Sequence, residues 1–414
     1  MKKVLWLCNL AFSDQAIKGG SWLQPLAEKL QQSNKILILN ISVGNVSKIT
    51  YTEYKGIKQW ILPQSKQKQY GQTATYKRCK EVQNIIESEK PDLVHIWGTE
   101  IFWASIYAKG FIKTKTLIDI QGLLYAYTDF YLGGLTINEI LNTIHIKEIL
   151  MPWRNLFTKQ QIFFKRGQVE LRYIKKFEHI SIQSQWVRNL LQQVNPIAHY
   201  YPTRILLRDN FYTAQPWSYK NTTSPIIFSS CAAAVSYKGI HVLLKSLALL
   251  KKEYPEIQLH LAGKIMVGDK LQDGYSIFLK KLIKKLNLQS NIVLLGSIDE
   301  SNIIKELQSC SVCVIPSFIE TYCLAFAEAM IIGVPTVTSY TGAMPELATH
   351  EKETLFYNSL DYRNAASHIS RLIKDQALAE QISQNARKRR LQENAPQLVL
   401  NTQLNIYKSI LYEI

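Results

Sequence analysis

Two carboxylates lie close together in a stretch of the chain that holds almost no other charge. Glu320 and Glu328 are separated by seven residues, and Glu328 is the only charged residue from Cys323 to Ile332. Burying a carboxylate is costly unless another group pairs with it or donates hydrogen bonds to it. Residues 306–346 contain no basic side chain, so a ligand rich in hydroxyl groups would suit Glu328. A solvated or salt-bridged pair is the alternative for two glutamates at this spacing.

The sequence around the pair predicts a strand, a helix and a second strand. Val312–Ile315 is a short apolar run rich in β-branched residues, which is typical of a buried strand. A helix should begin near Tyr322 and end at Gly333-Val334-Pro335, before a second strand over Thr336–Ser339. This order of elements is that of a parallel sheet, in which ligands bind at the carboxyl ends of the strands.

The predicted elements place both carboxylates near such a ligand. Glu320 should face it from the loop after the first strand, and Glu328 should lie about two turns into the helix. The backbone N–H groups of residues 321–324 have no partner within a helix that starts there, and they suit an anionic phosphate.

The same stretch resembles the E-x7-E segment of the retaining GT-B glycosyltransferases of family GT4, also called glycosyl transferases group 1. The family form has Pro-Ser, Glu-Gly-Phe-Gly-Leu, Glu-Ala-Met, Gly-x-Pro and a Gly-Gly-x-x-Glu turn. The matching residues here are Pro316-Ser317, Glu320-Thr321-Tyr322-Cys323-Leu324, Glu328-Ala329-Met330, Gly333-Val334-Pro335, Gly342 and Glu346. Thr321, Cys323 and Thr341 replace three glycines of the pattern.

Other segments extend the resemblance over most of the chain. Lys238-Gly239 precedes a leucine-rich stretch, as in the Lys-Gly-x-x-x-Leu helix of the family, and Gly19-Gly20-Ser21-Trp22 resembles its glycine-rich acceptor-side loop. The segments 91–95 and 116–122 match two of its N-terminal strands. The resemblance implies an α/β fold of the GT-B type, with two Rossmann-like parallel-sheet domains that face a central cleft. Within the family, the sequence is similar to bacterial surface-polysaccharide glycosyltransferases.

The resemblance also implies roles for individual residues. Lys238 and Glu320 would be catalytic, the lysine at the diphosphate of a sugar-nucleotide donor and the glutamate at the sugar. Glu328 would accept hydrogen bonds from the two ribose hydroxyls. The remaining donor-binding residues would be Tyr322, Cys323, Leu324, Gly20 and Gln121. Neither a metal nor another cofactor is implied.

Three features of the sequence bear on these roles. The family often has an arginine five residues before the lysine, where this chain has Ala233. Arg204, Lys264 or helix N–H groups would then have to replace its positive charge. Many relatives have a histidine where this chain has Gln121, which can hydrogen-bond a hydroxyl but cannot shuttle a proton. Lys238 itself has an alternative interpretation, as an exposed lysine that precedes a helix.

The length and patterning of the chain predict two domains. A chain of 414 residues exceeds one ordinary core, and strand and helix patterns alternate in both halves. We expect an acceptor-binding domain over residues 1–215 and a donor-binding domain over 216–392. Residues 393–414 should form a helix that packs back on the N-terminal domain.

Several classes of protein are excluded by the composition. No run of about 18 apolar residues predicts a spanning helix, and the N-terminus lacks the pattern of a signal peptide. The six cysteines are scattered, which favours a reducing cytosol, and Cys310-Ser311-Val312-Cys313 has no second pair that would suggest zinc. We therefore expect a cytoplasmic protein.

The net charge of +17 suggests that the protein contacts an anionic partner or surface. Basic and aromatic residues alternate over 153–177, where Glu170 is the only acidic residue. This mixture suits a peripheral contact with an anionic membrane on its inner face. A solvated helix that packs its apolar side on the domain is the alternative. No nucleic-acid-binding motif accompanies the charge, so nucleic acid is not expected as a partner.

The function implied by the resemblance is transfer of a hexose-type sugar from a nucleotide-sugar donor to a glycan or lipid-linked acceptor. Synthesis of a cell-surface polysaccharide or glycoconjugate would use such an enzyme. Two other classes stay open. One is a non-catalytic GT-B module that binds a sugar or a partner, which Ala233 and the missing glycines favour. The other is a different nucleotide-sugar enzyme on the same fold, such as an epimerase.

Overall fold

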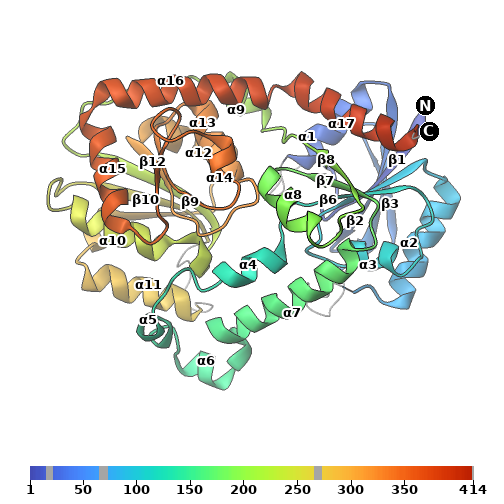
Figure 1. Cartoon of the computed structure of the whole chain (residues 1–414), viewed down its shortest axis with the longest axis horizontal. Helices are drawn as coiled ribbons and strands as arrows, with labels where there is room; N and C mark the ends of the chain where they lie inside the picture. The colour runs from blue at the N-terminus through green and yellow to red at the C-terminus, as the bar shows by residue number, and fades with distance from the viewer. Residues whose placement is uncertain (15–21, 65–72, 265–272, 413–414) are drawn as a thin grey trace. The chain divides into compact units, whose positions relative to one another are not determined.

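The computed structural model describes residues 1–14, 22–64, 73–264 and 273–412. It divides into two compact units, each built on a parallel sheet that carries helices (Figure 1). Unit 1 comprises Met1–Tyr125, Lys165–Arg208 and Glu393–Ile414, and unit 2 comprises Ala126–Phe164 and Asp209–Gln392. The chain therefore passes between the two units at four points.

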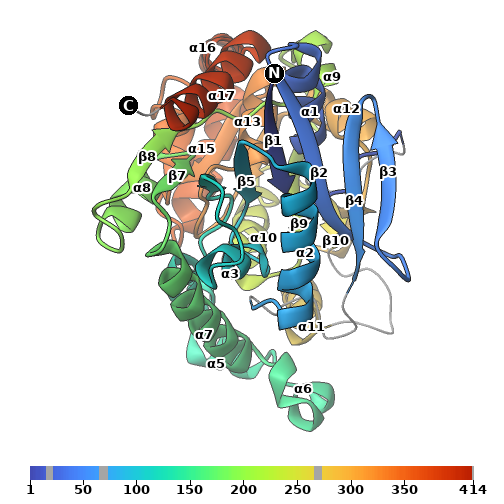
Figure 2. The same cartoon turned by 90° about the vertical axis from the view of Figure 1, so that its right-hand side faces the viewer.

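Unit 1 contains an eight-stranded sheet in the order β3-β4-β2-β1-β5-β6-β7-β8. Every neighbouring pair is parallel except the hairpin of β3 and β4, which lies beside β2 at one edge (Figure 2). Its strands are β1 (Lys2–Leu7), β2 (Ile36–Gly44), β3 (Thr50–Tyr54), β4 (Ile57–Pro63), β5 (Leu93–Trp97), β6 (Thr116–Asp119), β7 (His179–Ile182) and β8 (His199–Pro202). Its helices include α1 (Leu23–Gln32), α2 (Tyr76–Glu89), α3 (Trp103–Ala108), α8 (Gln185–Gln192) and α17 (Pro396–Leu411).

The centre of unit 1 is closed by the last helix of the chain. The strands β1 and β5 bury almost all of their side chains, as strands covered on both faces do. From α17, Tyr407 lies within this core: its hydroxyl accepts a hydrogen bond from Trp6 Nε1 at 3.0 Å and lies 2.7 Å from His95 Nδ1. Residues 393–414 thus contribute directly to the packing of unit 1.

Unit 2 contains a six-stranded, wholly parallel sheet in the order β11-β10-β9-β12-β13-β14. Its strands are β9 (Ile226–Ala233), β10 (Gln258–Lys264), β11 (Ile292–Gly296), β12 (Val312–Ile315), β13 (Thr336–Ser339) and β14 (Leu355–Tyr357). The order reverses between β9 and β12, and in doubly wound sheets a ligand crevice lies beyond the carboxyl ends of the strands at that point.

Helices α9 to α16 belong to unit 2. They are α9 (Asp209–Thr213), α10 (Ile240–Leu250), α11 (Gly274–Lys285), α12 (Glu300–Ser309), α13 (Leu324–Ile332), α14 (Met344–Leu347), α15 (Tyr362–Lys374) and α16 (Gln376–Glu393), the last of which ends at the unit boundary. The predicted strands over 312–315 and 336–339 are confirmed as β12 and β13. The helix between them begins at Leu324, two residues later than expected, because Tyr322 and Cys323 still belong to the turn.

Residues 126–164 join unit 2, although the expected partition assigns them to the N-terminal domain. They contain most of α4 (Leu124–Phe130), α5 (Ile137–Leu141), α6 (Ile146–Leu150) and the start of α7 (Leu156–Ile174). The contact with unit 2 is close: a Cβ added to Gly133 would lie 2.2 Å from the carbonyl oxygen of Ser236, and the Ser236 hydroxyl donates to the carbonyl of Tyr131. Because the residues in contact are more than 100 positions apart in the chain, no local sequence pattern indicates that they pack together.

Candidate donor site

An ion pair lies at the point where the strand order of unit 2 reverses. The chain leaves β9 and reaches Lys238, and it leaves β12 and reaches Glu320. The Nζ atom of Lys238 donates to Oε1 of Glu320 at 2.6 Å, and Glu320 is only 6% exposed. The two residues expected to be catalytic, 82 positions apart, are thus in direct contact.

The loops that carry this pair are fixed by two glycines. Gly239 has φ +69°, and a Cβ there would lie 1.8 Å from the carbonyl oxygen of Pro316. Gly342 has φ +50°, and a Cβ there would lie 2.2 Å from the carbonyl oxygen of Glu320. No other residue type fits either position without movement of the backbone. The loop after β12 is therefore held from both sides, and the position of Glu320 with it.

Cys323 keeps a backbone conformation that favours glycine. Its φ is +86° and its ψ is +85°, and it immediately precedes α13 without capping the helix through its side chain. A residue with a Cβ is disfavoured by about 1–2 kcal/mol at positive φ. The glycine of the family pattern is absent here, but the turn that requires it persists. Tyr322 and Cys323 are both buried, whereas Leu324 is half-buried.

Glu328 lies within α13 and is half-exposed, so it is not a carboxylate enclosed by apolar groups. Its neighbours Ala327 and Ala329 are fully buried. The helix directs its apolar side chains into unit 2 while one carboxylate remains accessible. This partial exposure is compatible with a ligand that approaches from solvent.

Tyr127 is a part of this site that the sequence did not indicate. Burial raises the pKa of its hydroxyl, Glu320 raises it further and Lys238 lowers it, so the phenol lies near both members of the pair. Its ring packs edge-on against Tyr237, with 5.3 Å between the ring centres. Tyr127 comes from α4, on residues 126–164, and only the contact of that segment with unit 2 brings it here.

The lysine of the pair keeps its charge in the folded protein. Burial by itself would lower the pKa of Lys238, but the adjacent Glu320 carboxylate raises it above the ordinary value for lysine. The lysine is therefore protonated at neutral pH. An ammonium group and a carboxylate at the switch point of a Rossmann-like sheet suit a ligand that carries both phosphate and hydroxyl groups.

Comparison with known proteins finds a family that most of unit 2 resembles. Residues 212–389 match the family described as Glycosyl transferases group 1. We call these residues the group 1 domain, after the family they resemble. The chain is 30% identical over 177 residues to the uncharacterized glycosyltransferase YqgM of Bacillus subtilis, a match that covers 42% of this chain and 47% of that one. It is 26% identical over 180 residues to the capsular polysaccharide biosynthesis glycosyltransferase CapM of Staphylococcus aureus, covering 43% and 45%.

The chain thus spans about half the length of these curated relatives. A solved structure of Anabaena HepE in complex with UDP and glucose superimposes with a TM-score of 0.67 at 15% identity, over 99% of this chain and 100% of that one. At this identity the likeness shows the fold, which is GT-B, as the sequence predicted.

Two candidates for the missing arginine charge lie in different units. Arg204 belongs to unit 1, where its Nη1 atom donates to the carbonyl of Glu393 at 3.0 Å. Lys264 ends β10 in the group 1 domain, is exposed, and pairs in register with Ala233 at the end of β9. Of the two, Lys264 is the cation that the sheet places beside the position of the family arginine.

Two expected donor-binding residues lie outside the group 1 domain. Gln121 follows β6 in unit 1 and is half-buried. Gly20 lies outside the described residues. Their relation to Lys238 and Glu320 therefore stays a prediction.

Unit 1 holds two buried carboxylates that the sequence did not indicate, Asp119 at a strand end and Glu170 on α7. Asp119, at the end of β6, accepts hydrogen bonds from Ser181 Oγ at 2.8 Å and from Gln183 Nε2 at 3.3 Å, yet burial raises its pKa to about 7. Burial also raises the pKa of Glu170 to about 7. Glu170 accepts from Thr99 and, at 2.9 Å, from the backbone N–H of Tyr125.

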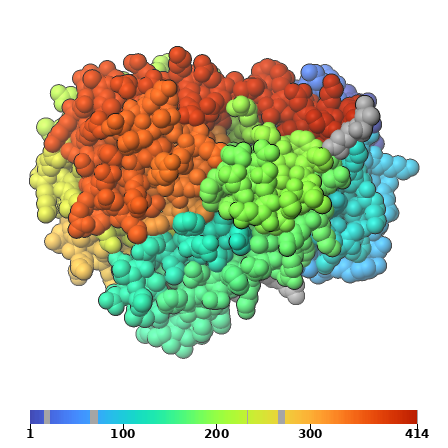
Figure 3. Space-filling model, viewed as in Figure 1, coloured from blue at the N-terminus to red at the C-terminus, as the bar shows by residue number. Residues whose placement is uncertain are grey.

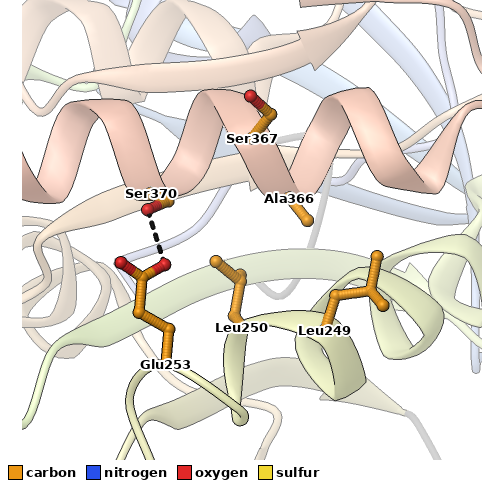
Figure 4. A pocket seen from close by; sticks show the side chains of 6 residues that line it. All are labelled: Leu249, Leu250, Glu253, Ala366, Ser367 and Ser370. Carbon is orange, nitrogen blue, oxygen red and sulfur yellow. Dashed lines mark hydrogen bonds between the residues drawn. The ribbon is translucent and has the colours of Figure 1, made fainter.

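A hollow on the group 1 domain lies away from the ion pair. It is lined by Leu249, Leu250, Glu253, Ala366, Ser367 and Ser370, between α10 and α15 (Figure 4). Lys238 lies just before α10, whereas this hollow lies at its far end, about 15 Å along the helix axis. Ser370 Oγ donates to Glu253 across it at 2.9 Å.

The described residues lack two kinds of feature. Within residues 1–14, 22–64, 73–264 and 273–412, no group of three or more acidic, histidine or cysteine side chains is arranged to hold a metal ion. No helix over the same ranges combines the length and apolarity needed to cross a bilayer.

Proposed function

We propose that the protein is a retaining GT4 glycosyltransferase that moves a hexose-type sugar from a nucleotide-sugar donor to a glycan or lipid-linked acceptor. The observation that carries the proposal is the contact of Lys238 with Glu320 at the strand-order reversal of a group 1 domain. Cleavage of a donor glycosidic bond leaves positive charge on the sugar and negative charge on the diphosphate. A carboxylate and an ammonium group beside one another can stabilise both.

The proposal gives each residue the role that the family resemblance implies. Lys238, the N–H groups at the start of α13 and Lys264 would receive the diphosphate. Glu320 would bind the sugar hydroxyls and stabilise the positive charge that develops on the ring. Half-exposed Glu328 would accept hydrogen bonds from the ribose. The mechanism needs no metal cofactor, because these side chains and N–H groups supply the positive charge.

The acceptor and the cellular site belong to the same proposal. The match to a capsular polysaccharide biosynthesis enzyme supports synthesis of a surface polysaccharide or glycoconjugate. A lipid-linked acceptor would place the protein in the cytoplasm, peripherally on the inner face of the membrane. The strongly basic composition supports this placement.

Replacement of one carboxylate tests the proposal. A thermal-shift screen of UDP, GDP and ADP sugars should first identify a donor that stabilises the protein. Glu328→Ala should then abolish transfer and weaken nucleotide binding, while the melting temperature without ligand stays close to that of the parent protein. The matched control is Glu256→Ala, which removes an exposed glutamate elsewhere in unit 2. Full turnover by the Glu328→Ala variant would refute the proposal.

A non-catalytic module is the second candidate, and two observations favour it. Ala233 stands where the family has an arginine, and Cys323 occupies a left-handed position that favours glycine. Incubation with a radiolabelled donor distinguishes the possibilities. Release or transfer of labelled sugar identifies a transferase, a rearranged nucleotide sugar identifies an epimerase, and binding without any product identifies a binding module.

A further inference from the structure

A patch of large apolar side chains is exposed on unit 2. Of the 24 large hydrophobic residues exposed in the described ranges, ten fall between residues 137 and 164. The most exposed include Ile146 at 74%, Leu150 at 71% and Ile149 at 66%, with Trp153 at 53%. These four side chains define the apolar patch. Three of them lie on α6 and Trp153 follows it, in the teal and green region at the bottom of Figure 3. Concentrated apolar exposure of this kind marks a binding surface.

The segment that carries the patch is firmly attached to unit 2. A Cβ added to Gly274, the first residue of α11, would lie 1.7 Å from the carbonyl oxygen of Thr143. Lys159 Nζ donates to Asp273 at 3.1 Å, just before the same helix. The apolar side chains are therefore exposed on a structured surface, and their exposure does not result from a detached segment.

The exposed charged side chains of residues 137–165 are positive. Residues 137–165 contain two carboxylates, and both are engaged: Glu139 accepts from Lys245 at 2.7 Å, and buried Glu148 lies 3.7 Å from Arg154. Lys147 and Lys165 are exposed in the same segment. The start of α11 contacts this segment, and the helix carries exposed lysines at positions 281, 284 and 285, about 10–16 Å further along its axis.

The positive charge on this part of unit 2 favours one of the possible binding partners of the apolar patch. A second copy of the chain would bring a patch of the same positive sign against this one, which like-charge repulsion disfavours. An anionic lipid surface offers negative phosphates to the lysines and an apolar interior to the patch, as interfacial helices require. The net charge of +17 acts in the same direction.

We propose that the apolar patch docks on the surface of an anionic lipid bilayer. Ile146, Ile149, Leu150 and Trp153 enter the boundary between headgroups and acyl chains, and the surrounding lysines contact lipid phosphates. This docking rests on the proposed function, because it would bring unit 2 to a lipid-linked acceptor.

The structure also divides the basic and aromatic stretch that the sequence singled out. Its later part is packed, because Ile174 and Phe177 are buried and the ring of Phe163 lies 4.6 Å from that of Tyr131. Phe157, Ile162 and Phe164, earlier in the stretch, are exposed. The apolar patch shares Trp153 with this stretch, and its other three members lie before it on α6.

Flotation with lipid vesicles tests the inference. The full chain should float with vesicles of phosphatidylcholine and phosphatidylglycerol, and not with phosphatidylcholine alone, and added salt should release it. The double substitution Ile149→Glu with Leu150→Glu should weaken binding by about a hundredfold, because two apolar side chains leave the interface and two negative charges face it. The control Ile197→Glu changes an isoleucine of unit 1 that is 87% exposed, and it should bind as the parent does.

Other outcomes would overturn the inference. Equal binding of the double variant and the parent would show that the patch is not the docking surface. A dimer in sedimentation that the double variant abolishes, without vesicle binding by the parent, would assign the patch to a second copy of the chain. Donor stabilisation, measured on the same preparations without lipid, separates the two proposals: flotation without any response to nucleotide sugars would refute the transferase and leave the docking surface in place.

Discussion

Units 1 and 2 are both built on doubly wound parallel sheets, but they place opposite electrostatic environments at their strand ends. In unit 2, β9 and β12 lead to a charged lysine in contact with a carboxylate. In unit 1, β6 ends at Asp119, a buried carboxyl group whose pKa of about 7 leaves it substantially protonated at neutral pH. The sheet topology determines where a site can lie, and the loop residues determine what charge it presents.

The comparison also separates two ways of holding a polar group. Glu320 is held through its backbone, since Gly239 and Gly342 admit a close approach of the chain on both sides of the loop. Asp119 is held through its side chain, which Ser181 and Gln183 meet with hydrogen bonds. The first arrangement leaves the Glu320 carboxylate free to exchange Lys238 for a ligand. In the second arrangement, the carboxylate of Asp119 itself accepts the hydrogen bonds that hold the loop and strand together.

The largest effect is expected from removal of the cation in unit 2. Lys238→Met should lower the rate of transfer by about 10²–10³-fold, because a preorganised charge at the leaving group is lost. The control is Lys245→Met, which breaks another 2.7 Å ion pair of unit 2, with Glu139, two turns along α10. Steady-state kinetics with the identified donor measure both variants. A similar loss in the two would indicate that Lys238 only stabilises the fold.

Closure of the space at Gly239 should destabilise the loop arrangement of unit 2. Gly239→Ala should lower the free energy of unfolding by about 4 kcal/mol, since the new Cβ meets a backbone carbonyl at a positive φ. Gly296→Ala is a matched control: its φ is +66°, and nothing lies within 4 Å of an added Cβ. That variant should lose only about 1 kcal/mol. Denaturant titration measures the free energy of unfolding of both variants. A larger loss in Gly239→Ala would show a clash with the Pro316 carbonyl, and equal losses would leave only the cost of a positive φ.

Two carboxylates of unit 1, Asp119 and Asp92, should change the pH dependence of stability in opposite directions. Asp119 has a raised pKa in the folded state, so the native protein binds a proton that the unfolded chain has released above about pH 4. Stability should therefore fall, by at most about 1.4 kcal/mol per pH unit, as the pH rises from about 4 to about 7. Asp119→Asn should flatten this slope in thermal melts.

Asp92 provides the control, because it pairs with Lys2 at 2.7 Å and its pKa is lowered in spite of partial burial. Its contribution to stability is present above the unfolded pKa and is lost as the pH falls through the folded value. Asp92→Asn should therefore leave the slope between pH 4 and pH 7 unchanged. A flattened slope in this variant, and not in Asp119→Asn, would contradict the assignment.

The smallest effect is expected at Cys323. Because its φ is +86°, Cys323→Gly should be more stable than Cys323→Ala by about 1 kcal/mol. At Ala325, the second residue of the regular helix α13, substitution by glycine should instead destabilise by at most about 1 kcal/mol. Thermal denaturation of the three variants tests whether the glycine turn of the family persists without its glycine.

The local part of this fold was predictable and the distant part was not. The strand, helix and strand of residues 312–339 follow from β-branched runs and from the Gly333-Val334-Pro335 stop, signals that lie within the segment itself. The contact of Lys238 with Glu320 joins positions 82 apart, and only the family resemblance pointed to it. Tyr127 could not be predicted, because its place depends on which unit the segment 126–164 packs against.

The hydrogen bond from Trp6 to Tyr407 has a consequence for the synthesis of the chain. The two residues are 401 positions apart, yet they lie in the same core. During translation, β1 leaves the ribosome 401 residues before Tyr407, its partner in the core. The central strands of unit 1 must therefore wait, with their apolar face uncovered, until residue 407 has been made. Most of unit 2 is synthesised during that interval, so we expect chaperones to meet the N-terminal strands first.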